Sequence, residues 1–229
     1  MSHSSIHREI DTMAKLTPST LSLTTLKRVV NLQINEMADY EWTQVDAIQL
    51  TNREQQRLQE LKEDLLYYPV LLMSEATLLA RVLYPLLLLA EHPPIRALVQ
   101  VALQARYAQF EIEGIADLAL AKSISGFIES PFLIIVEVKR GIEGQNPVMQ
   151  LYAHLLAAAH LNWESNGQPQ QEIFGGYTVA DTWTFIKAEV NGIDADIPTL
   201  RIEHSREYTE KLEAEIIVKI LKKIVYKYK

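Results

Sequence analysis

The segment FLIIVEVK, residues 132–139, constrains the fold of this chain more than any other stretch. Its branched apolar side chains are nearly continuous, and the run has the length of a strand that is covered on both faces. Glu137 and Lys139 interrupt it two positions apart, so both side chains project from the same face of the sheet. We therefore expect a buried central strand that carries charge, with helices packed on the sheet.

The segments before this strand predict three helices and two short strands. Thr51 and Glu54 form a capping-box pattern at the start of a helix that runs to about Tyr68. An apolar helix is expected over 69–90 and another over 95–106. A β-rich run follows over 110–120, with Glu113 and Gly114 at a hairpin or bulge.

The segments after the strand predict a helix, two strands and a final helix. The helix begins at Pro147, the strands lie in IFGGYTVA and TWTFIKAEV, and an amphipathic helix ends the chain. This order predicts an α/β fold with a mixed central β-sheet flanked by helices. We divide the chain into an N-terminal arm and helical extension, 1–68, and a main domain, 69–229, which includes the C-terminal helix.

Several classes of protein are excluded or disfavoured. The chain has no cysteine, which excludes disulfide frameworks, thiolate zinc sites and cysteine nucleophiles. The motifs GxxxxGK[ST], GxGxxG, HExxH and GxSxG are absent. The N-terminus lacks the apolar stretch of a secretory signal, which predicts a cytoplasmic protein. Segment 69–90 carries Glu75, Arg81 and Pro85, so we expect a buried helix rather than a membrane span, and no membrane partner.

The charge of the chain is unevenly distributed. The formal net charge is −7, which opposes the approach of a polyanion. From Lys211 onward, however, the chain has six lysines and only two glutamates. Lys219, Lys222 and Lys223 are the candidates for contacts with phosphate groups. The alternative is that the lysines form only a solvated helix face.

Asp117 is a third charged residue in an apolar segment, after Glu137 and Lys139 of the central strand. It lies in the apolar run GIADLAL about 20 residues before Glu137, a spacing that fits a neighbouring strand. Burial of unpaired charges is costly, and a divalent cation between the carboxylates of Asp117 and Glu137 would offset that cost. The alternative is a buried salt bridge between Asp117 and Lys139, with Glu137 turned toward a strand edge.

This pattern resembles the PD-(D/E)XK nuclease superfamily, in which an Asp on one strand precedes (Asp/Glu)-x-Lys on the next. Here the motif reads Asp117, then Glu137, Val138 and Lys139. SEATLLARVLYPLLLLA, with Glu75, resembles the first helix of restriction-endonuclease-like proteins, and Gln150 matches a Gln on the helix after the Lys strand. GGYTVADTWTFIKAE is similar to paired strands in the N-terminal nuclease domains of type I restriction subunits. The resemblance spans 73–189, about half of the chain.

The resemblance implies a restriction-endonuclease-like core and a Mg²⁺-dependent deoxyribonuclease, with Mn²⁺ as a substitute. Asp117, Glu137 and the carbonyl of Val138 would bind the metal, with Glu75 at a second metal site. Lys139 would serve the attacking water and Gln150 would position water or phosphate. The chain departs from the family pattern at Ala116, where Pro is common, and at His154, where one branch has Tyr.

Other interpretations stay open at this point. The chain could be a noncatalytic nuclease-fold subunit that binds DNA or a protein partner. In either case we expect DNA as a partner, and a protein partner or a homo-oligomer stays open. It could also be an interaction protein, since residues 36–75 hold nine acidic and three basic residues. Glu75 could instead neutralise Arg81, Gln150 could be a surface residue, and His154 fits a packing or hydrogen-bonding role better than a metal ligand.

Overall fold

The structure is a computed structural model that describes residues 13–141 and 146–228. Its strands are β1 (Ala14–Leu16), β2 (Asn31–Ile34), β3 (Ile95–Arg106), β4 (Phe110–Ile124), β5 (Phe127–Lys139), β6 (Gln170–Val179), β7 (Thr182–Asn191) and β8 (Thr199–Thr209). Its α-helices are α1 (Leu23–Val29), α2 (Asn52–Tyr67), α3 (Glu75–Leu78), α4 (Tyr84–Ala90), α5 (Pro147–Asn166) and α6 (Glu210–Tyr226). Short turns of 3₁₀ helix are η1 (Pro18–Thr20), η2 (Glu41–Thr43) and η3 (Val70–Leu72), and η4 (Leu79–Leu83) is a π-helical turn.

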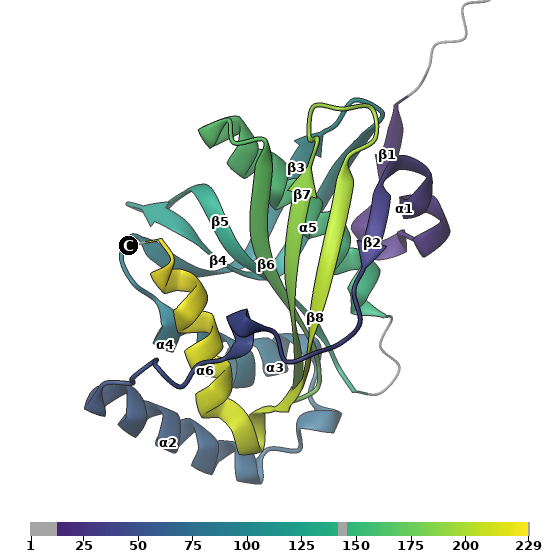
Figure 1. The fold of residues 1–229 in the computed structure, drawn as a ribbon. Helices are drawn as coiled ribbons and strands as arrows, with labels where there is room; N and C mark the ends of the chain where they lie inside the picture. Colours follow the sequence, from purple (N-terminus) through teal and green to yellow (C-terminus); the bar gives the residue numbers. More distant parts are fainter. Residues whose placement is uncertain (1–12, 142–145, 229) are drawn as a thin grey trace, which may run out of the picture.

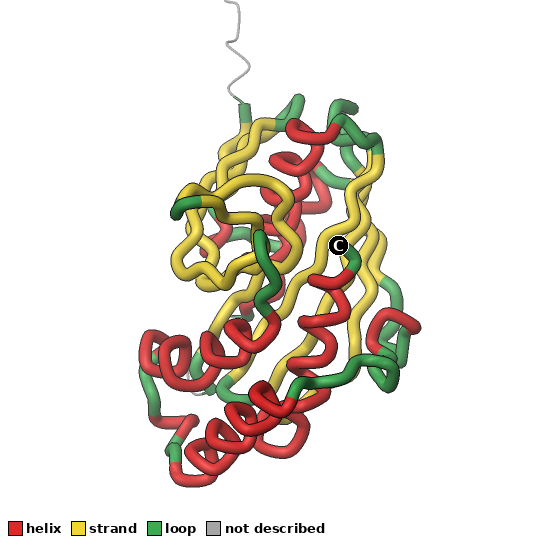
Figure 2. The backbone as a smooth tube through the Cα atoms, turned by 90° about the vertical axis from the view of Figure 1, so that its left-hand side faces the viewer, coloured by secondary structure: helices red, strands yellow, loops and turns green. Residues whose placement is uncertain are grey.

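The described strands form one mixed sheet in the order β1-β4-β5-β6-β7-β8-β2, and β3 pairs with β4. The pairs β3–β4, β4–β5, β6–β7 and β7–β8 are antiparallel, while β5 and β6 run parallel because α5 connects them. The strands at the β3–β4–β5 end curl strongly (Figure 2). The predicted α/β class with a mixed sheet flanked by helices is confirmed.

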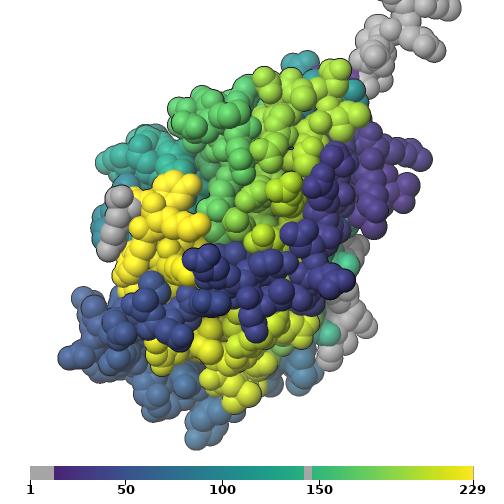
Figure 3. Space-filling model, viewed as in Figure 1, coloured from purple at the N-terminus to yellow at the C-terminus, as the bar shows by residue number. Residues whose placement is uncertain are grey.

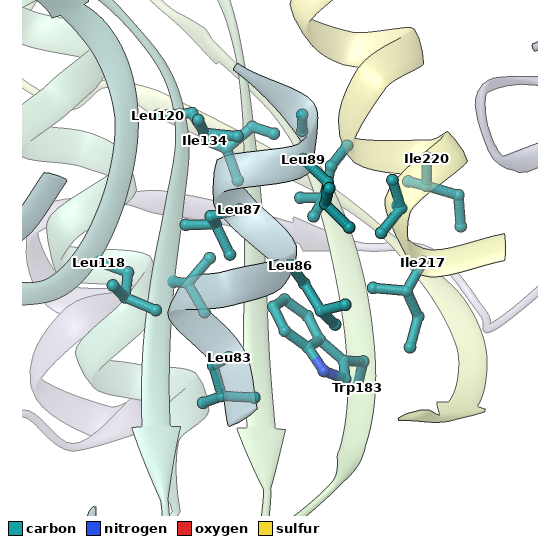
Figure 4. Packing of buried hydrophobic residues seen from close by; sticks show 14 of the residues in the cluster. Leu83, Leu86, Leu87, Leu89, Leu118, Leu120, Ile134, Trp183, Ile217 and Ile220 are labelled. Carbon is teal, nitrogen blue, oxygen red and sulfur yellow. The ribbon is translucent and has the colours of Figure 1, made fainter. Parts of the chain in front are cut away.

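The two faces of the sheet are covered by different helices. α6 crosses in front of the sheet and α5 lies behind it (Figure 1). On the α6 side, leucines of α4 pack between strand residues such as Leu118 and Ile134 and the α6 residues Ile217 and Ile220, next to Trp183 (Figure 4). On the other side, buried Leu and Ala residues of α5 pack against β4, β5 and β6. The hydrophobic effect holds both layers, at roughly 1.5–3 kcal/mol for each large apolar side chain that is fully buried.

The N-terminal quarter of the chain is built onto the same sheet. β1 pairs in parallel with β4, and β2 pairs in parallel with β8. The segment between β2 and α2 crosses the surface formed by β8 and α6 (Figure 3), where the backbone NH groups of Asn35 and Ala38 donate to Ile202 and His204. The predicted capping box of α2 is confirmed, since Thr51 and Glu54 satisfy each other's backbone NH groups.

Two secondary-structure predictions are wrong. Residues 95–106 form strand β3 and not a helix, because buried Ile95, Ala97, Val101, Leu103 and Ala105 alternate with more exposed residues at the period of a strand. Glu113 and Gly114 do not form a hairpin, since β4 continues through them. The hairpin lies earlier, where the NH of Tyr107 donates to the carbonyl of Phe110.

The apolar segment 69–90 is helical but interrupted. The turn η4 precedes α4, and the NH of Tyr84 donates to the carbonyl of Leu79, five residues back. Pro85 explains this wider turn, because proline offers no NH and its ring displaces the carbonyl four residues earlier. Within 13–141 and 146–228, no helix has both the length and the apolar character needed to cross a membrane.

Candidate functional site

The candidate site lies where β4 and β5 separate. Their antiparallel pairing reaches Leu118 and Val136, and beyond that point Glu137, Val138 and Lys139 pair only with β6 among the described strands. The side chain of Asp117 takes the place of the missing partner, since its Oδ2 accepts a hydrogen bond of 2.8 Å from the NH of Val138. The sheet therefore brings the aspartate of β4 to the charged end of β5.

Glu137 is the most deeply buried charged residue of this region. Its side chain is 0% exposed, and its Oε1 lies 2.5 Å from Nδ1 of His154 on α5. Its Oε2 is buried and has no hydrogen-bond partner. Burial raises the pKa of Glu137, and the nearby Asp117 carboxylate acts in the same direction, whereas His154 and Lys139 oppose them. An unpaired buried carboxylate oxygen costs free energy unless a ligand satisfies it.

His154 is held against Glu137 by close packing. Its side chain is also buried, and its Nε2 has no hydrogen-bond partner. Gly114 of β4 makes room for the ring, because a Cβ atom there would lie 2.6 Å from Nε2 of His154 and 2.7 Å from Cγ of Pro18. The prediction of a packing or hydrogen-bonding role for His154 is confirmed, although the sequence did not identify Glu137 as its partner.

Lys139 faces Glu75 rather than Asp117. Its Nζ lies 3.8 Å from Oε2 of Glu75, the first residue of α3, with the lysine side chain 14% and the glutamate side chain 44% exposed. No ion pair within the described ranges joins Lys139 to Asp117, so the alternative of a salt bridge between them is wrong. Within the described ranges, Glu75 pairs with Lys139 and not with Arg81, whose guanidinium lies over the ring of Tyr68.

The remaining predicted residue, Gln150, is only near the site. It lies on α5 one turn before His154 and is partly buried. No hydrogen bond connects its side chain to Asp117, Glu137 or Lys139 in the part of the chain that the structure describes. The structure therefore brings together Asp117, Glu137, Val138, Lys139 and Glu75, and leaves Gln150 on the adjoining helix.

A residue that the sequence did not single out also contacts Asp117. The Nε2 of Gln100 on β3 donates a hydrogen bond of 3.3 Å to Oδ1 of Asp117. No motif marks this glutamine, and the prediction of a helix over 95–106 hid its place on the strand next to Asp117. Both oxygens of Asp117 are thus oriented by donors, one from each neighbouring strand.

The lysines of α6 are engaged in structural contacts. Lys219 pairs with Glu215 at 2.7 Å, Lys222 pairs with Glu54 of α2, and Lys223 donates to backbone carbonyls before α2. Lys222 is 3% exposed. The burial of Lys222 contradicts both predictions for this residue, the solvated helix face and the contact with phosphate groups, and Lys219 and Lys223 already have partners.

The site fits a small, hard divalent cation by the type of its donors. Among the described residues, no group of three or more His, Asp or Glu side chains is arranged to hold a metal ion. Mg²⁺, however, is commonly bound by one or two carboxylates together with water and substrate phosphate. Glu137 Oε2, which is buried and unpaired, and the adjacent Asp117 supply such a pair.

No protein-family model matches the chain, and no curated protein matches its sequence. The function of this chain is therefore inferred from the chemistry of the site itself.

Proposed function

We propose that this chain is a Mg²⁺-dependent nuclease with a restriction-endonuclease-like core that hydrolyses phosphodiester bonds of DNA. The observation that carries the proposal is the unpaired, fully buried Oε2 of Glu137 next to Asp117. Such an oxygen is costly in a folded protein, and beside a second carboxylate and a lysine it is a candidate position for a ligand. The order of the elements around it, a helix, three antiparallel strands, a helix and a parallel strand, also agrees with the resemblance.

Each residue of the site has a role that its surroundings support. Asp117 and Glu137 would hold the cation, together with the carbonyl of Val138. When bound, the cation supplies positive charge to the scissile phosphate and acidifies water. Lys139 is poised beside them with its ammonium group held by Glu75, so it would orient water and offset negative charge on the phosphate.

Two residues have supporting roles. Glu75 is 44% exposed and would move between Lys139 and a second cation as substrate enters. Gln150 would orient water or phosphate from the first turns of α5, one turn from His154. Both roles follow from the family resemblance, with Glu75 next to Lys139 and Gln150 on the adjoining helix α5.

Metal binding tests the site directly. Mn²⁺ or Mg²⁺ should raise the thermal midpoint, because a cation that binds the native state stabilises it. Asp117→Asn and Glu137→Gln should abolish this rise, whereas Glu210→Gln should keep it. Glu210 is the matched control, because it is an equally buried glutamate on the other side of the sheet. A metal response that is unchanged in both site variants would reject the assignment.

Cleavage tests the activity. The parent chain with Mg²⁺ should nick plasmid DNA, and low salt should help because the chain carries a net charge of −7. Lys139→Ala should lose nicking while it retains the thermal response to Mn²⁺, since its ammonium serves water and phosphate rather than the cation. Loss of folding in Lys139→Ala would indicate a structural lysine instead.

A noncatalytic nuclease-fold subunit that binds DNA or a protein partner is the second candidate. The observation that favours it is the internal pairing of the site, because His154 already occupies Oε1 of Glu137 and both oxygens of Asp117 accept hydrogen bonds. This candidate predicts a parent chain with no response to Mn²⁺ and no nicking. Glu137→Gln would then change stability alone.

A further inference from the structure

Gln100 has a backbone conformation that is unusual inside a strand, and it lies where β3 passes from the core on the α6 side to the core on the α5 side. Among the described residues other than glycine, Gln100, Ser125 and Ala180 have positive φ angles, of 52°, 53° and 55°. Ser125 and Ala180 lie in two-residue hairpin turns, β4–β5 and β6–β7, where left-handed residues are usual. Gln100 lies inside the twelve-residue strand β3, where no turn requires this conformation.

The strained residue lies opposite Asp117. On the β3–β4 ladder Val99 pairs with Leu118 and Val101 pairs with Ala116, and Gln100 and Asp117 lie between these two pairs. The left-handed backbone accompanies a side chain that reaches across the ladder, since Nε2 of Gln100 donates to Oδ1 of Asp117 at 3.3 Å. A left-handed glutamine is strained, and such strain often clusters at functional sites.

The two oxygens of Asp117 are oriented from two directions. The backbone NH of Val138 fixes Oδ2 from β5, and the carboxamide of Gln100 fixes Oδ1 from β3. Donors around a metal ligand set the direction of its free lone pairs, and their loss typically weakens metal binding about 10- to 100-fold. Val138 acts through its backbone, so Gln100 is the side chain through which this orientation can be altered.

We propose that Gln100 is a positioning residue that orients Asp117 for the divalent cation, and that the left-handed backbone of β3 at this point serves that role. This inference rests on the proposed function, because it assigns Gln100 to the same cation site. Gln100 touches the ligand and not the cation, so its effect is on affinity through Asp117. Because Gln100 is exposed, its side chain can be substituted without rearrangement of the core.

Gln100→Gly separates strain from function. Glycine adopts a positive φ at no steric cost, so the metal-free variant should have a thermal midpoint equal to the parent's or higher by up to about 4 °C. Its affinity for Mn²⁺ alone, measured by titration of the thermal shift and by electron paramagnetic resonance, should fall about 10-fold. A residue with only a structural role would not combine retained stability with weaker metal binding.

Gln104→Gly is the matched control. Gln104 is also an exposed glutamine of β3, it pairs regularly with Glu113, and its φ is not positive. Glycine there should lower the midpoint by about 2 °C and leave Mn²⁺ affinity unchanged. Gln100→Asn keeps a carboxamide on a residue that tolerates the left-handed region, so it should bind Mn²⁺ more tightly than Gln100→Gly.

The outcomes distinguish this inference from the proposed function. Equal Mn²⁺ affinity in the parent and in Gln100→Gly, with Asp117→Asn still abolishing binding, overturns the role of Gln100 and leaves the metal site intact. Two other results also overturn the role of Gln100. One is a Gln100→Gly variant that loses stability together with Mn²⁺ affinity. The other is a Gln100→Asn variant that binds Mn²⁺ no more tightly than Gln100→Gly. A parent chain that does not bind Mn²⁺ overturns the proposed function, and the role of Gln100 with it.

Discussion

Among the described residues, two glutamates are completely buried, one on each side of the sheet, and their surroundings are opposite in character. Glu137 and Glu210 are both 0% exposed, and each has one oxygen without a hydrogen-bond partner. Glu137 on the α5 side has His154, Lys139 and Asp117 as ionisable neighbours. Glu210, the first residue of α6, accepts a hydrogen bond of 2.9 Å from the indole NH of Trp183 and has Asp181 nearby.

The comparison shows that burial alone does not mark a functional carboxylate. No cation lies close to Glu210 among the neighbours that influence its pKa, and burial raises that pKa to about 8. A pKa of about 8 favours the neutral acid at pH 7, and its Oε2 accepts the hydrogen bond from Trp183. Glu137 lies at the end of β5 among other ionisable groups, which are His154, Asp117 and Lys139. The neighbours of each carboxylate, rather than its depth, separate the candidate site from the structural residue.

The largest expected effect concerns Glu210 and pH. Its pKa is about 8 in the folded chain against 4.5 for the ordinary carboxyl, so between these values the native state binds more protons than the unfolded state. The contribution of Glu210 to stability is therefore full below about pH 4.5 and is lost as pH rises through about 8. The loss is on the order of 4 kcal/mol.

Glu210→Gln tests this effect, because glutamine keeps an acceptor for Trp183 and does not ionise. Urea unfolding of both proteins from pH 5 to pH 9 should show the parent losing stability relative to the variant. A difference between the two proteins that does not change with pH would mean that Glu210 is not a neutral buried acid, and the contrast with Glu137 would fail.

The next effect concerns the packing that holds His154 on Glu137. Gly114→Ala places a Cβ atom 2.6 Å from Nε2 of His154, so the ring or β4 must shift, at a cost of about 1–3 kcal/mol. Gly176→Ala is the control on the other side of the sheet, because its nearest neighbours are ring atoms of Trp183 and Phe185 at 3.6–3.7 Å. We expect that control to remain within about 0.5 kcal/mol of the parent by urea unfolding. Equal stability of the two variants would show that His154 is free to move.

The pair of carboxylates, Asp117 and Glu137, could be predicted from the sequence because each interrupts the apolar pattern of its own strand. Glu137 and Lys139 stand out in an apolar run, and Asp117 stands out in another, so period-two alternation sufficed to predict that they share a region. Their partners depend on contacts between distant segments. His154 comes from α5, Glu75 from α3 and Gln100 from β3, and no local pattern fixes how these elements approach.

The fold was predictable to a similar degree. The capping box of α2 is a local interaction and was recovered, whereas β3 was misassigned because Pro93 and Pro94 resemble a helix start and the alternation of small apolar residues is weak. The parallel strands β1 and β2 depend on pairing with β4 and β8, which lie far along the chain. Such pairing is a tertiary property.

A smaller effect is expected at Lys222, the buried charge of α6. It is 3% exposed and pairs with Glu54, whose side chain is 21% exposed. Lys222→Met should lower the free energy of unfolding by about 1–2 kcal/mol, below the cost for a fully buried pair because Glu54 keeps contact with water. The thermal response to Mn²⁺ should not change. A lost metal response would instead connect the α6 side to the site.

The smallest effect is expected at Lys219, one turn before Lys222 on the same helix. It pairs with Glu215 at 2.7 Å, four residues earlier, and the glutamate side chain is 54% exposed. Pairs of this kind contribute about 0.2–0.5 kcal/mol, so Lys219→Gln should be nearly neutral in urea unfolding. If Lys219 also contacts phosphate, the variant should flatten the slope of log DNA affinity against log salt by about 0.9, without loss of stability. An unchanged slope together with unchanged stability would show that Lys219 contributes neither to DNA binding nor measurably to the stability of the fold.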